Sequence, residues 1–286
     1  MMTIQQGKKY LVTGGSGFLG HEVVKRIVGA GASAVVLSRD EGQLILLKQS
    51  FPSTEIFTGD VGDRFCVQQA IKGVAGVFHL AAFKHVGMAE LQSRECTKSN
   101  VYGSLNVLEE SIKENIDFII GISTDKAAQI SGVYGASKYI MEKLFQQFEK
   151  NYSNIKFRIV RYGNVLYSTG SVLCKWRDLL KGGKEVIVTE PKATRFFWTL
   201  EQAVDLIFDC LENASDSNPY VPEMKSMSVK NLLQAMANKY LPEGEELKIK
   251  QIGLQPGENF HERVIETGKY SNEVEQFTVE EIQELI

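Results

Sequence analysis

The sequence predicts an α/β protein with a doubly wound parallel sheet and a smaller C-terminal lobe. Strand-like and helix-like segments alternate through the first 160 residues. The strand-like segments are short apolar runs without polar alternation, as expected for a sheet that is covered on both faces. A glycine-rich turn also follows the first strand and opens the first helix.

The first half of the chain supplies the predicted sheet. A strand over 8–13 leads into a helix over Phe18–Gly29, and a long helix over Cys96–Glu114 is the clearest of the later connections. The further strands are expected at 33–38, 54–58, 76–82, 116–123 and 156–160.

The pattern becomes less regular after about residue 161. A loop over 162–171 precedes three predicted helices and a short strand, which are expected at 172–181, 201–212, 229–240 and 247–254. We therefore expect a first domain over 1–165, to which 186–212 returns, and a smaller lobe formed mainly by 166–286.

The composition is that of an ordinary globular protein. With 286 residues, of which 43% are hydrophobic, the chain can bury a large core without disulfides. A net charge of -3 does not indicate the basic surface that nucleic-acid binding requires, so we expect a small-molecule partner. The four cysteines and four histidines show no ligand-like spacing, which favours a reducing, cytoplasmic location and no metal site. We see no signal peptide and no membrane-spanning run, and expect a soluble protein.

The segment "VTGGSGFLG" after the first strand is the first chemical motif. Glycines there permit a tight turn and close approach of a pyrophosphate to the N-terminus of a helix. The motif predicts a Rossmann-type dinucleotide site, although a glycine turn that serves packing alone is the alternative. The residues expected to hold the cofactor here are Gly14, Ser16, Gly17, Phe18, Leu19 and Gly20.

The end of the second strand suggests which dinucleotide binds. Ser38 and Arg39 suit the 2′-phosphate of NADP, whereas the neighbouring Asp40 keeps NAD possible. Asp60, followed by Val61, could contact the adenine end, or could serve only as a turn or cap.

Tyr134 and Lys138 in "YGASK" lie one helical turn apart. We expect the ammonium to lower the pKa of the phenol, so that a tyrosinate can take the proton of an alcohol while hydride leaves. Ser123 and Thr124 precede this helix at the carboxyl end of a strand, which is where open α/β sheets bind ligands.

Several separate blocks together resemble the extended short-chain dehydrogenase/reductases, and within them the UDP-N-acetylglucosamine 4,6-dehydratases. These blocks are the glycine motif, "HLAAFKHV", "STDKAA", "YGASK" and "RYGNV", and the likeness covers Lys9 to about Glu262. The resemblance implies a hydro-lyase that holds NADP tightly, oxidises carbon 4 of a nucleotide sugar, eliminates water across carbons 5 and 6, and returns the hydride to carbon 6. It also implies a homo-oligomer, a redox role for Tyr134 and Lys138, and a hydrogen bond from Thr124 to the reacting hydroxyl.

In such a reaction Asp125 and Lys126 would have a catalytic function that a simple oxidation or reduction does not require. Elimination needs a base at carbon 5 and an acid at carbon 6. From the sequence we expect Lys126 to remove the carbon 5 proton and Asp125 to protonate the leaving hydroxyl. A carboxylate and an ammonium held together favour the opposite, charged forms. A solvent-exposed ion pair in a loop is the alternative.

The resemblance also implies residues along the cofactor and the sugar nucleotide. Ala81, Ala82 and Lys84 are expected along the cofactor. The substrate residues are expected to be Lys84, His85, Asn100, Asn164, Thr194, Arg195, Gln255 and Glu258. Gln255, Asn259 and Thr169 stand where relatives carry cations, which weakens the case for a particular sugar nucleotide because charge-assisted contacts are the stronger ones.

The chain resembles the short branch of this family. Longer, membrane-anchored relatives commonly carry Met at the position of Tyr134, and the short branch inverts carbon 5. Two alternatives stay open: a nucleotide-sugar 4-epimerase or reductase on the same scaffold, and an NADP-binding protein without turnover.

Overall fold

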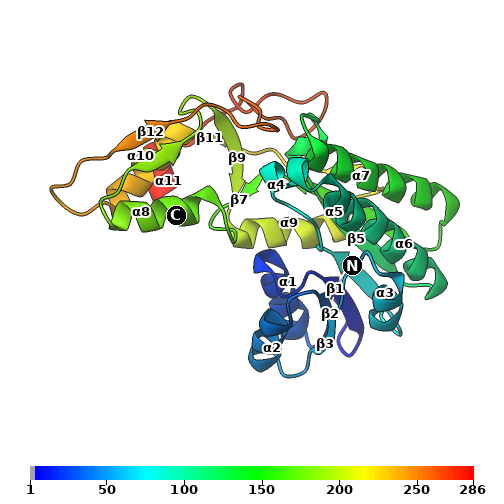
Figure 1. The fold of residues 1–286 in the computed structure, drawn as a ribbon. Coiled ribbons are helices and arrows are strands. Elements are labelled where there is room, and N and C mark those ends of the chain that lie inside the picture. The colour runs from blue at the N-terminus through cyan, green and yellow to red at the C-terminus, as the bar shows by residue number, and fades with distance from the viewer. Residues whose placement is uncertain (1–3) are drawn as a thin grey trace.

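The computed structural model, which describes residues 4–286, has a seven-stranded parallel sheet at its centre (Figure 1). The strand order is β10-β6-β5-β4-β1-β2-β3, so the chain winds outward in both directions from β1 and β4. The strands are β1 (Lys9–Thr13), β2 (Ser33–Ser38), β3 (Glu55–Thr58), β4 (Gly76–His79), β5 (Phe118–Thr124), β6 (Lys156–Tyr162) and β10 (Pro219–Tyr220). The predicted doubly wound fold is confirmed.

Helices cover both faces of this sheet. One face carries α1 (Phe18–Gly29), α2 (Glu41–Ser50) and α9 (Leu200–Asn213). The other face carries α3 (Arg64–Ala70), α6 (Gly103–Lys113) and α7 (Val133–Asn151). Within β1, Tyr10 and Val12 join the first core while Leu11 joins the second, which explains why the strand has no polar face.

The predicted helix over Cys96–Glu114 is interrupted. The chain after β4 forms α4 (Val86–Leu91) and α5 (Ser93–Thr97), then a π-helical turn, η1 (Lys98–Tyr102), before α6. Such turns are frequent at functional sites. The one here contains Asn100, whose side chain bonds the backbone of Phe83 in the loop after β4.

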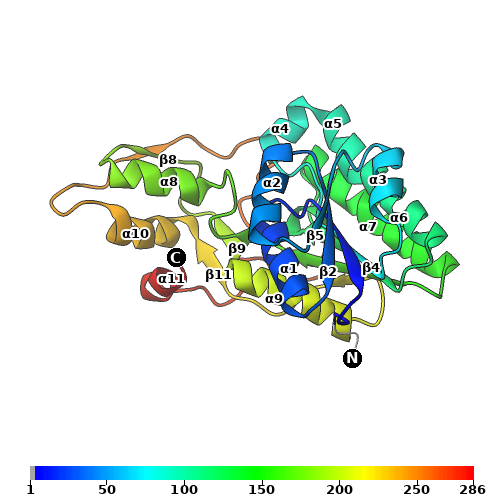
Figure 2. The same ribbon diagram turned by 90° about the horizontal axis from the view of Figure 1, so that it is seen from below.

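The smaller lobe projects from one side of the sheet (Figure 2). It holds a sheet of β7 (Asn164–Val165), β9 (Thr194–Trp198) and β11 (Ser226–Ser228), and the pair β8 (Val186–Val188) and β12 (Ile249–Gln251). Its helices are α8 (Val172–Lys181), α10 (Val229–Tyr240) and α11 (Val279–Leu285). Of the segment 186–212, α9 packs against the large sheet, whereas β8 pairs with β12 in the lobe.

Several predicted boundaries agree with the structure. Helices occupy 18–29, 172–181 and 229–240 as expected. The fourth strand ends at His79 rather than at residue 82, so Leu80–His85 forms a loop at the sheet edge. None of the helices within residues 4–286 combines the length and apolar character that a membrane crossing requires.

Arg161 of β6 fastens the C-terminal segment to the sheet. Its side chain is 1% exposed. Nε and Nη2 donate to Glu142 of α7 at 2.9 and 2.5 Å, and Nη1 donates to the carbonyl of Val264 at 2.8 Å. Glu266 accepts from the same guanidinium at 3.0 Å. Three parts of the chain therefore share one buried cation, which fixes the loop around residue 262 beside the sheet.

We predict that Arg161→Met lowers the free energy of unfolding by about 3–5 kcal/mol, because it leaves the buried Glu142 carboxylate without its partner. Urea denaturation followed by circular dichroism measures this. The double variant Arg161→Met, Glu142→Leu should lose less, since no charge is stranded. Arg94→Met, at a side chain that is 96% exposed, is the control and should leave stability unchanged. Equal losses in the single and double variants would contradict the interpretation.

Candidate active site

A cleft of about 1380 Å³ lies at the carboxyl ends of the parallel strands and extends to the smaller lobe. It spans the point where the strand order reverses between β1 and β4, which is where open α/β sheets bind ligands. Of the residues singled out from the sequence, those lining the cleft are Gly14, Ser16, Gly17, Phe18, Leu19, Gly20, Ser38, Arg39, Asp40, Asp60, Val61, Ala81, Ala82, Lys84, His85, Ser123, Thr124, Lys126, Tyr134, Lys138, Asn164, Thr169, Arg195 and Glu258.

The glycine turn forms a cradle that only glycine fits. Gly14 has φ +70°, and a Cβ there would lie 2.9 Å from the amide nitrogen of Ala81. A Cβ on Gly20 would lie 2.4 Å from the carbonyl oxygen of Gly14. The N-cap residue of α1, Gly17, provides no side-chain cap, so the first amides of the helix remain available to an anion. This arrangement fits the pyrophosphate of a dinucleotide.

The ends of β2 and β3 form the adenosine side of the cleft. The Ser16 hydroxyl donates to that of Ser38 at 2.7 Å, and Arg39 lines the same wall. Asp40 instead caps α2, where Oδ1 accepts from the Gln43 amide at 3.0 Å. Asp60 accepts from the Gly62 amide at 2.8 Å, so it has a turn role as well as a place in the cleft.

The end of β5 brings three polar residues together, of which Thr124 and Lys126 line the cleft and Asp125 is buried beside them. Thr124 closes the strand, and a 3₁₀ turn, η2 (Asp125–Ala127), carries the next two. The Thr124 hydroxyl donates to Asp125 Oδ1 at 2.8 Å. Helix α7 packs closely on this turn, because a Cβ on Gly135 would lie 2.3 Å from the Lys126 carbonyl oxygen. That close approach places Tyr134 beside the turn.

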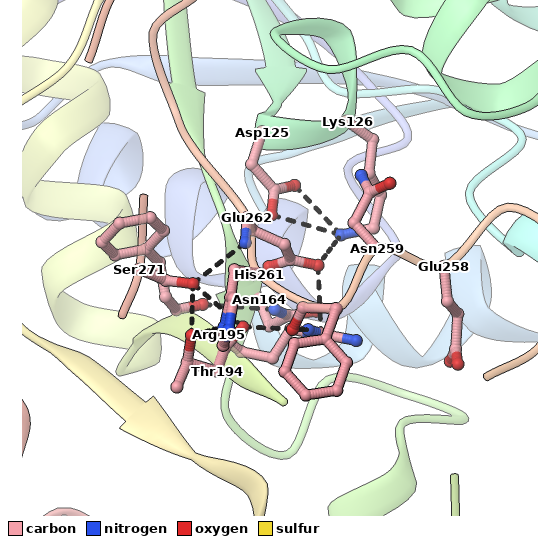
Figure 3. Close-up of polar contacts among 12 residues, drawn as sticks. Asp125, Lys126, Asn164, Thr194, Arg195, Glu258, Asn259, His261, Glu262 and Ser271 are labelled. Carbon is pink, nitrogen blue, oxygen red and sulfur yellow. Dashed lines mark hydrogen bonds and ion pairs between the residues drawn. The ribbon is translucent and has the colours of Figure 1, made fainter. Parts of the chain in front are cut away.

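Lys126 lies between two carboxyl groups (Figure 3). Its Nζ is 3.1 Å from Asp125 Oδ1 and 3.0 Å from Glu262 Oε1, and Arg195 Nε is 3.2 Å from that same Glu262 oxygen. The side chains of Asp125, Lys126 and Glu262 are 1%, 16% and 4% exposed. A solvent-exposed ion pair, the alternative left open by the sequence, is therefore wrong. We call Asp125, Lys126, Arg195 and Glu262 the four-residue charge cluster.

Burial and charge oppose each other within this cluster. Burial acts to raise the pKa of Asp125, but the charge of Lys126 and nearby hydrogen bonds hold that pKa below its usual value. Burial acts to lower the pKa of Lys126, yet Asp125 and Glu262 raise it above the ordinary lysine range. For Glu262, burial and the charge of Asp125 raise the pKa to about 8, against the two cations. The pair Asp125–Lys126 is thus in its charged forms.

The expected pKa of Tyr134 is wrong in direction. Burial raises the pKa of this phenol to about 12, and Lys126, not Lys138, is the cation that opposes the rise. Burial also lowers the pKa of Lys138 to about 8, and its Nζ contacts the sulfur of Met141 at 3.1 Å. The spacing of four residues places both Tyr134 and Lys138 in the cleft. Spacing alone does not determine which group each of the two side chains contacts.

Four predicted residues do not line the cleft. Asp125 lies behind Lys126, and Gln255 is exposed, with its amide donating to the Gly253 carbonyl at 3.3 Å. Asn100 is buried and braces the site instead of contacting a ligand. It bonds the Phe83 backbone at 2.7 and 2.9 Å and Ser137 of α7 at 2.9 Å.

Thr194 is the fourth of these residues, and its role is also one of support. Its hydroxyl lies 2.8 Å from His261 Nδ1 and 2.6 Å from the Ser271 hydroxyl. Arg195 does reach the cleft, but its guanidinium already donates to the carbonyls of Thr194 and Phe260 and pairs with Glu262. It is therefore committed to the protein rather than free for a diphosphate.

Sequence reasoning missed Glu262. The residue ends the segment "LQPGENFHE", but its partner Lys126 lies 136 positions away. No local spacing links the two. The one available signal is the presence of a carboxylate in a segment that resembles the family's substrate loop. That signal does not distinguish Glu262 from Glu258, which lies in the same segment.

Comparisons with known proteins agree with this geometry. The model of the family described as "Polysaccharide biosynthesis protein" matches residues 10–283. An uncharacterized membrane protein of Methanocaldococcus jannaschii is 35% identical over 97% of this chain and 84% of its own length. A UDP-N-acetylglucosamine 4,6-dehydratase (inverting) of Campylobacter jejuni is 34% identical over 91% and 78%. A UDP-glucose 4-epimerase of Rickettsia canadensis is 32% identical over 90% and 77%.

Among solved structures, that of Pen from Bacillus thuringiensis superposes with a TM-score of 0.92 at 27% identity, over 98% of this chain and 97% of the other. The family match covers nearly the whole chain, and the sheet, the glycine cradle and the Tyr134 helix are those expected of it. The chain therefore belongs to the polysaccharide biosynthesis protein family, within the extended short-chain dehydrogenase/reductases.

Proposed function

We propose that this protein is a nucleotide-sugar dehydratase that uses NADP. Its substrate is a UDP-N-acetylhexosamine, for which we propose UDP-N-acetylglucosamine, and its product is the 4-keto-6-deoxy sugar nucleotide with carbon 5 inverted. The observation that carries the proposal is the buried Asp125–Lys126 pair, whose Lys126 lines the cleft floor beside Tyr134. A simple oxidoreductase has no use for an ion pair in that place.

The cofactor would lie along the glycine cradle with its 2′-phosphate near Ser38 and Arg39. Because the Asp40 carboxylate caps α2, it is less available to bind a ribose diol, and this supports NADP over NAD. The oxidised nicotinamide supplies a hydride acceptor at carbon 4 of the sugar and later returns that hydride.

Tyr134 and Thr124 would serve the redox step. Both line the cleft at the carboxyl end of β5, where a carbon 4 hydroxyl can be placed between them. Tyr134 accepts the hydroxyl proton, and positive charge at Lys126 favours the phenolate that does so. Lys138, also in the cleft, adds further positive charge when it is protonated.

For the elimination we propose roles that are the reverse of those expected from the sequence. Neutral Lys126 and protonated Asp125 would lie at least about 9 kcal/mol above the charged pair, because even ordinary pKa values of 10.5 and 3.8 separate the two groups that far. The charged forms suit the reverse assignment. Because Lys126 separates Asp125 from the cleft, this assignment requires the bound sugar to draw the Lys126 side chain toward carbon 6 and so expose Asp125. The Asp125 carboxylate then takes the carbon 5 proton, and the Lys126 ammonium gives a proton to the hydroxyl that leaves carbon 6. A proton transfer between them then restores the pair. When the hydride returns to carbon 6, carbon 5 takes a proton from solvent on the face opposite Asp125, which is balanced by release to solvent of the proton that Tyr134 took from the carbon 4 hydroxyl.

The substrate half of the cleft combines few cations with apolar walls. Lys84 is held near the Thr169 carbonyl at 3.3 Å, with His85 beside it, and both face the space where a diphosphate would lie. Asn164 and Glu258 supply hydrogen-bonding groups. The walls from the smaller lobe include Leu173, Trp176 and Leu232, which suit a flat base.

A 4-epimerase of nucleotide sugars is the second candidate, because a UDP-glucose 4-epimerase is among the relatives at 32% identity. Epimerisation needs the Tyr134 redox step but not the Asp125–Lys126 pair. The two functions therefore differ in whether the charge cluster takes part in catalysis: a dehydratase needs it as acid and base, and an epimerase does not.

We predict that the purified protein with NADP converts UDP-N-acetylglucosamine to a product lighter by one water. Mass spectrometry detects the loss, and proton NMR shows the new methyl group and the carbon 5 configuration. A product of unchanged mass with carbon 4 inverted would identify an epimerase instead. Retention at carbon 5 would contradict only the stereochemical part.

We predict opposite effects of the two cluster variants in D2O. Asp125→Asn should lose both deuterium incorporation at carbon 5 of recovered substrate and water loss. Lys126→Met should slow carbon 5 exchange, because the charge that favours the Tyr134 phenolate and the Asp125 carboxylate is lost, but should lower dehydration by about a further hundredfold or more, because the acid is missing. Lys143→Met, on an exposed side chain of α7, is the control. Exchange that survives in Asp125→Asn but not in Lys126→Met would restore Lys126 as the base, and full turnover in both variants would favour the epimerase.

We predict that Arg39→Ala weakens NADP binding by about tenfold or more while binding of NAD changes little, because a charge-assisted contact to the 2′-phosphate is lost. Calorimetric titration with each nucleotide measures both dissociation constants, so NAD binding is the internal control. Equal effects on the two nucleotides, or tighter binding of NAD by the unaltered protein, would argue against NADP.

A further inference from the structure

Glu262 has an unusual set of contacts for a buried carboxyl group. Oε1 accepts a hydrogen bond from Lys126 at 3.0 Å and forms an ion pair with Arg195, whose Nε is 3.2 Å away, whereas Oε2 is buried and has no hydrogen-bond partner. A buried carboxylate oxygen without a partner is costly. A protonated carboxyl at Glu262 can donate to the neighbouring Asp125, and this hydrogen bond acts to raise the pKa of Glu262.

The position of Glu262 is fixed by its own backbone and by β9. Its amide donates to the Ser271 hydroxyl at 2.9 Å, and that hydroxyl lies 3.1 Å from the Thr194 carbonyl (Figure 3). The amide of Thr194 donates in turn to the Phe260 carbonyl at 3.2 Å. The loop therefore cannot easily turn the carboxyl away from Lys126.

We propose that Glu262 is a positioning residue for the elimination, which must carry a proton so that Lys126 can act as the acid. This inference rests on the proposed dehydratase function. Protonated Glu262 leaves the Lys126 ammonium with one carboxylate, Asp125. Ionised Glu262 gives the ammonium a second counter-charge and binds its proton more tightly, so water loss slows.

The charged and titratable groups around Glu262 come from four parts of the chain. Asp125 and Lys126 come from η2, Arg195 from β9, and His261 from its own loop, while Tyr134 of α7 lies close to the pair. A pKa near 8 places the ionisation of Glu262 just above neutral pH. Activity in the elimination is thus full below this pKa and falls as pH rises through it.

No net proton is consumed by this arrangement. Asp125 gains the proton of carbon 5 and Lys126 loses one to the hydroxyl of carbon 6, so the carbon–oxygen bond breaks and water leaves. Asp125 then returns its proton to Lys126, 3.1 Å away. Glu262 keeps its own proton throughout, which distinguishes its role from that of an acid.

The test compares two rates that follow the same oxidation. Carbon 5 exchange needs only the base, whereas water loss also needs Lys126, so their ratio cancels any effect of pH on the redox residues. Between pH 7 and pH 9 the ratio of exchange to dehydration should rise about tenfold in the unaltered enzyme. In Glu262→Gln it should stay flat, with dehydration retained at pH 9, because the amide imitates the protonated carboxyl. Glu262→Asp restores an ionisable group and should restore the rise.

Infrared spectroscopy gives a readout that does not depend on turnover. The protein without substrate should show the carbonyl stretch of a protonated carboxyl at pH 7, which disappears at pH 10 and is absent from Glu262→Gln. Glu273→Gln, at an exposed position of the same segment, is the matched control and should keep the band.

The outcomes separate this inference from the proposed function. Absence of the infrared band, or a rising ratio in Glu262→Gln like that of the unaltered enzyme, overturns the role of Glu262 even if water is eliminated. A uniform loss of dehydration at every pH in Glu262→Gln also overturns it. Absence of a dehydrated product from the unaltered enzyme overturns the proposed function. If the variant fails to fold, the infrared titration and the ratio of the unaltered protein still decide.

Discussion

A lysine ammonium held between two carboxyl groups, out of bulk water and at the end of a parallel strand, is the constraint on which the chemistry depends. Taking Asp125, Lys126 and Glu262 out of water is costly, and mutual pairing offsets that cost only when the geometry is good. Such a cluster is therefore weak support for stability. Its place beside a dinucleotide cradle gives it a use that a purely structural ion pair lacks.

The rest of the fold holds this cluster in position. The parallel sheet brings the end of β5 to the point where the strand order reverses, and Gly135 lets α7 press against the η2 turn. From the other side, Arg161 binds both α7 and the C-terminal segment, so the loop that carries Glu262 is anchored to the sheet. Asn100 reaches from a π-helical turn to fix the loop after β4. These contacts are rigid and buried, as an acid–base site requires.

Local patterns in the sequence were sufficient to predict most of the fold. Apolar strands, the glycine turn and helical periodicity depend on neighbours a few residues apart, and the helices at 18–29 and 172–181 show this. The π-turn at Lys98–Tyr102 and the pairing of Glu262 with Lys126 depend on contacts between distant segments, which spacing cannot reveal. The pKa of Tyr134 was missed for a related reason. Burial, which is a property of the whole fold, outweighs the charge of Lys126, which comes from the turn before the helix rather than from one helical turn along it.

A crystal structure of the protein with NADP and UDP-N-acetylglucosamine tests the central claim most directly. We expect the carbon 6 hydroxyl within hydrogen-bond distance of Lys126 Nζ, carbon 5 facing the Asp125 carboxylate, and carbon 4 between Tyr134 and the nicotinamide. A sugar bound with carbons 5 and 6 pointing away from this pair would contradict the claim, because the cluster could then take no part in the removal of water.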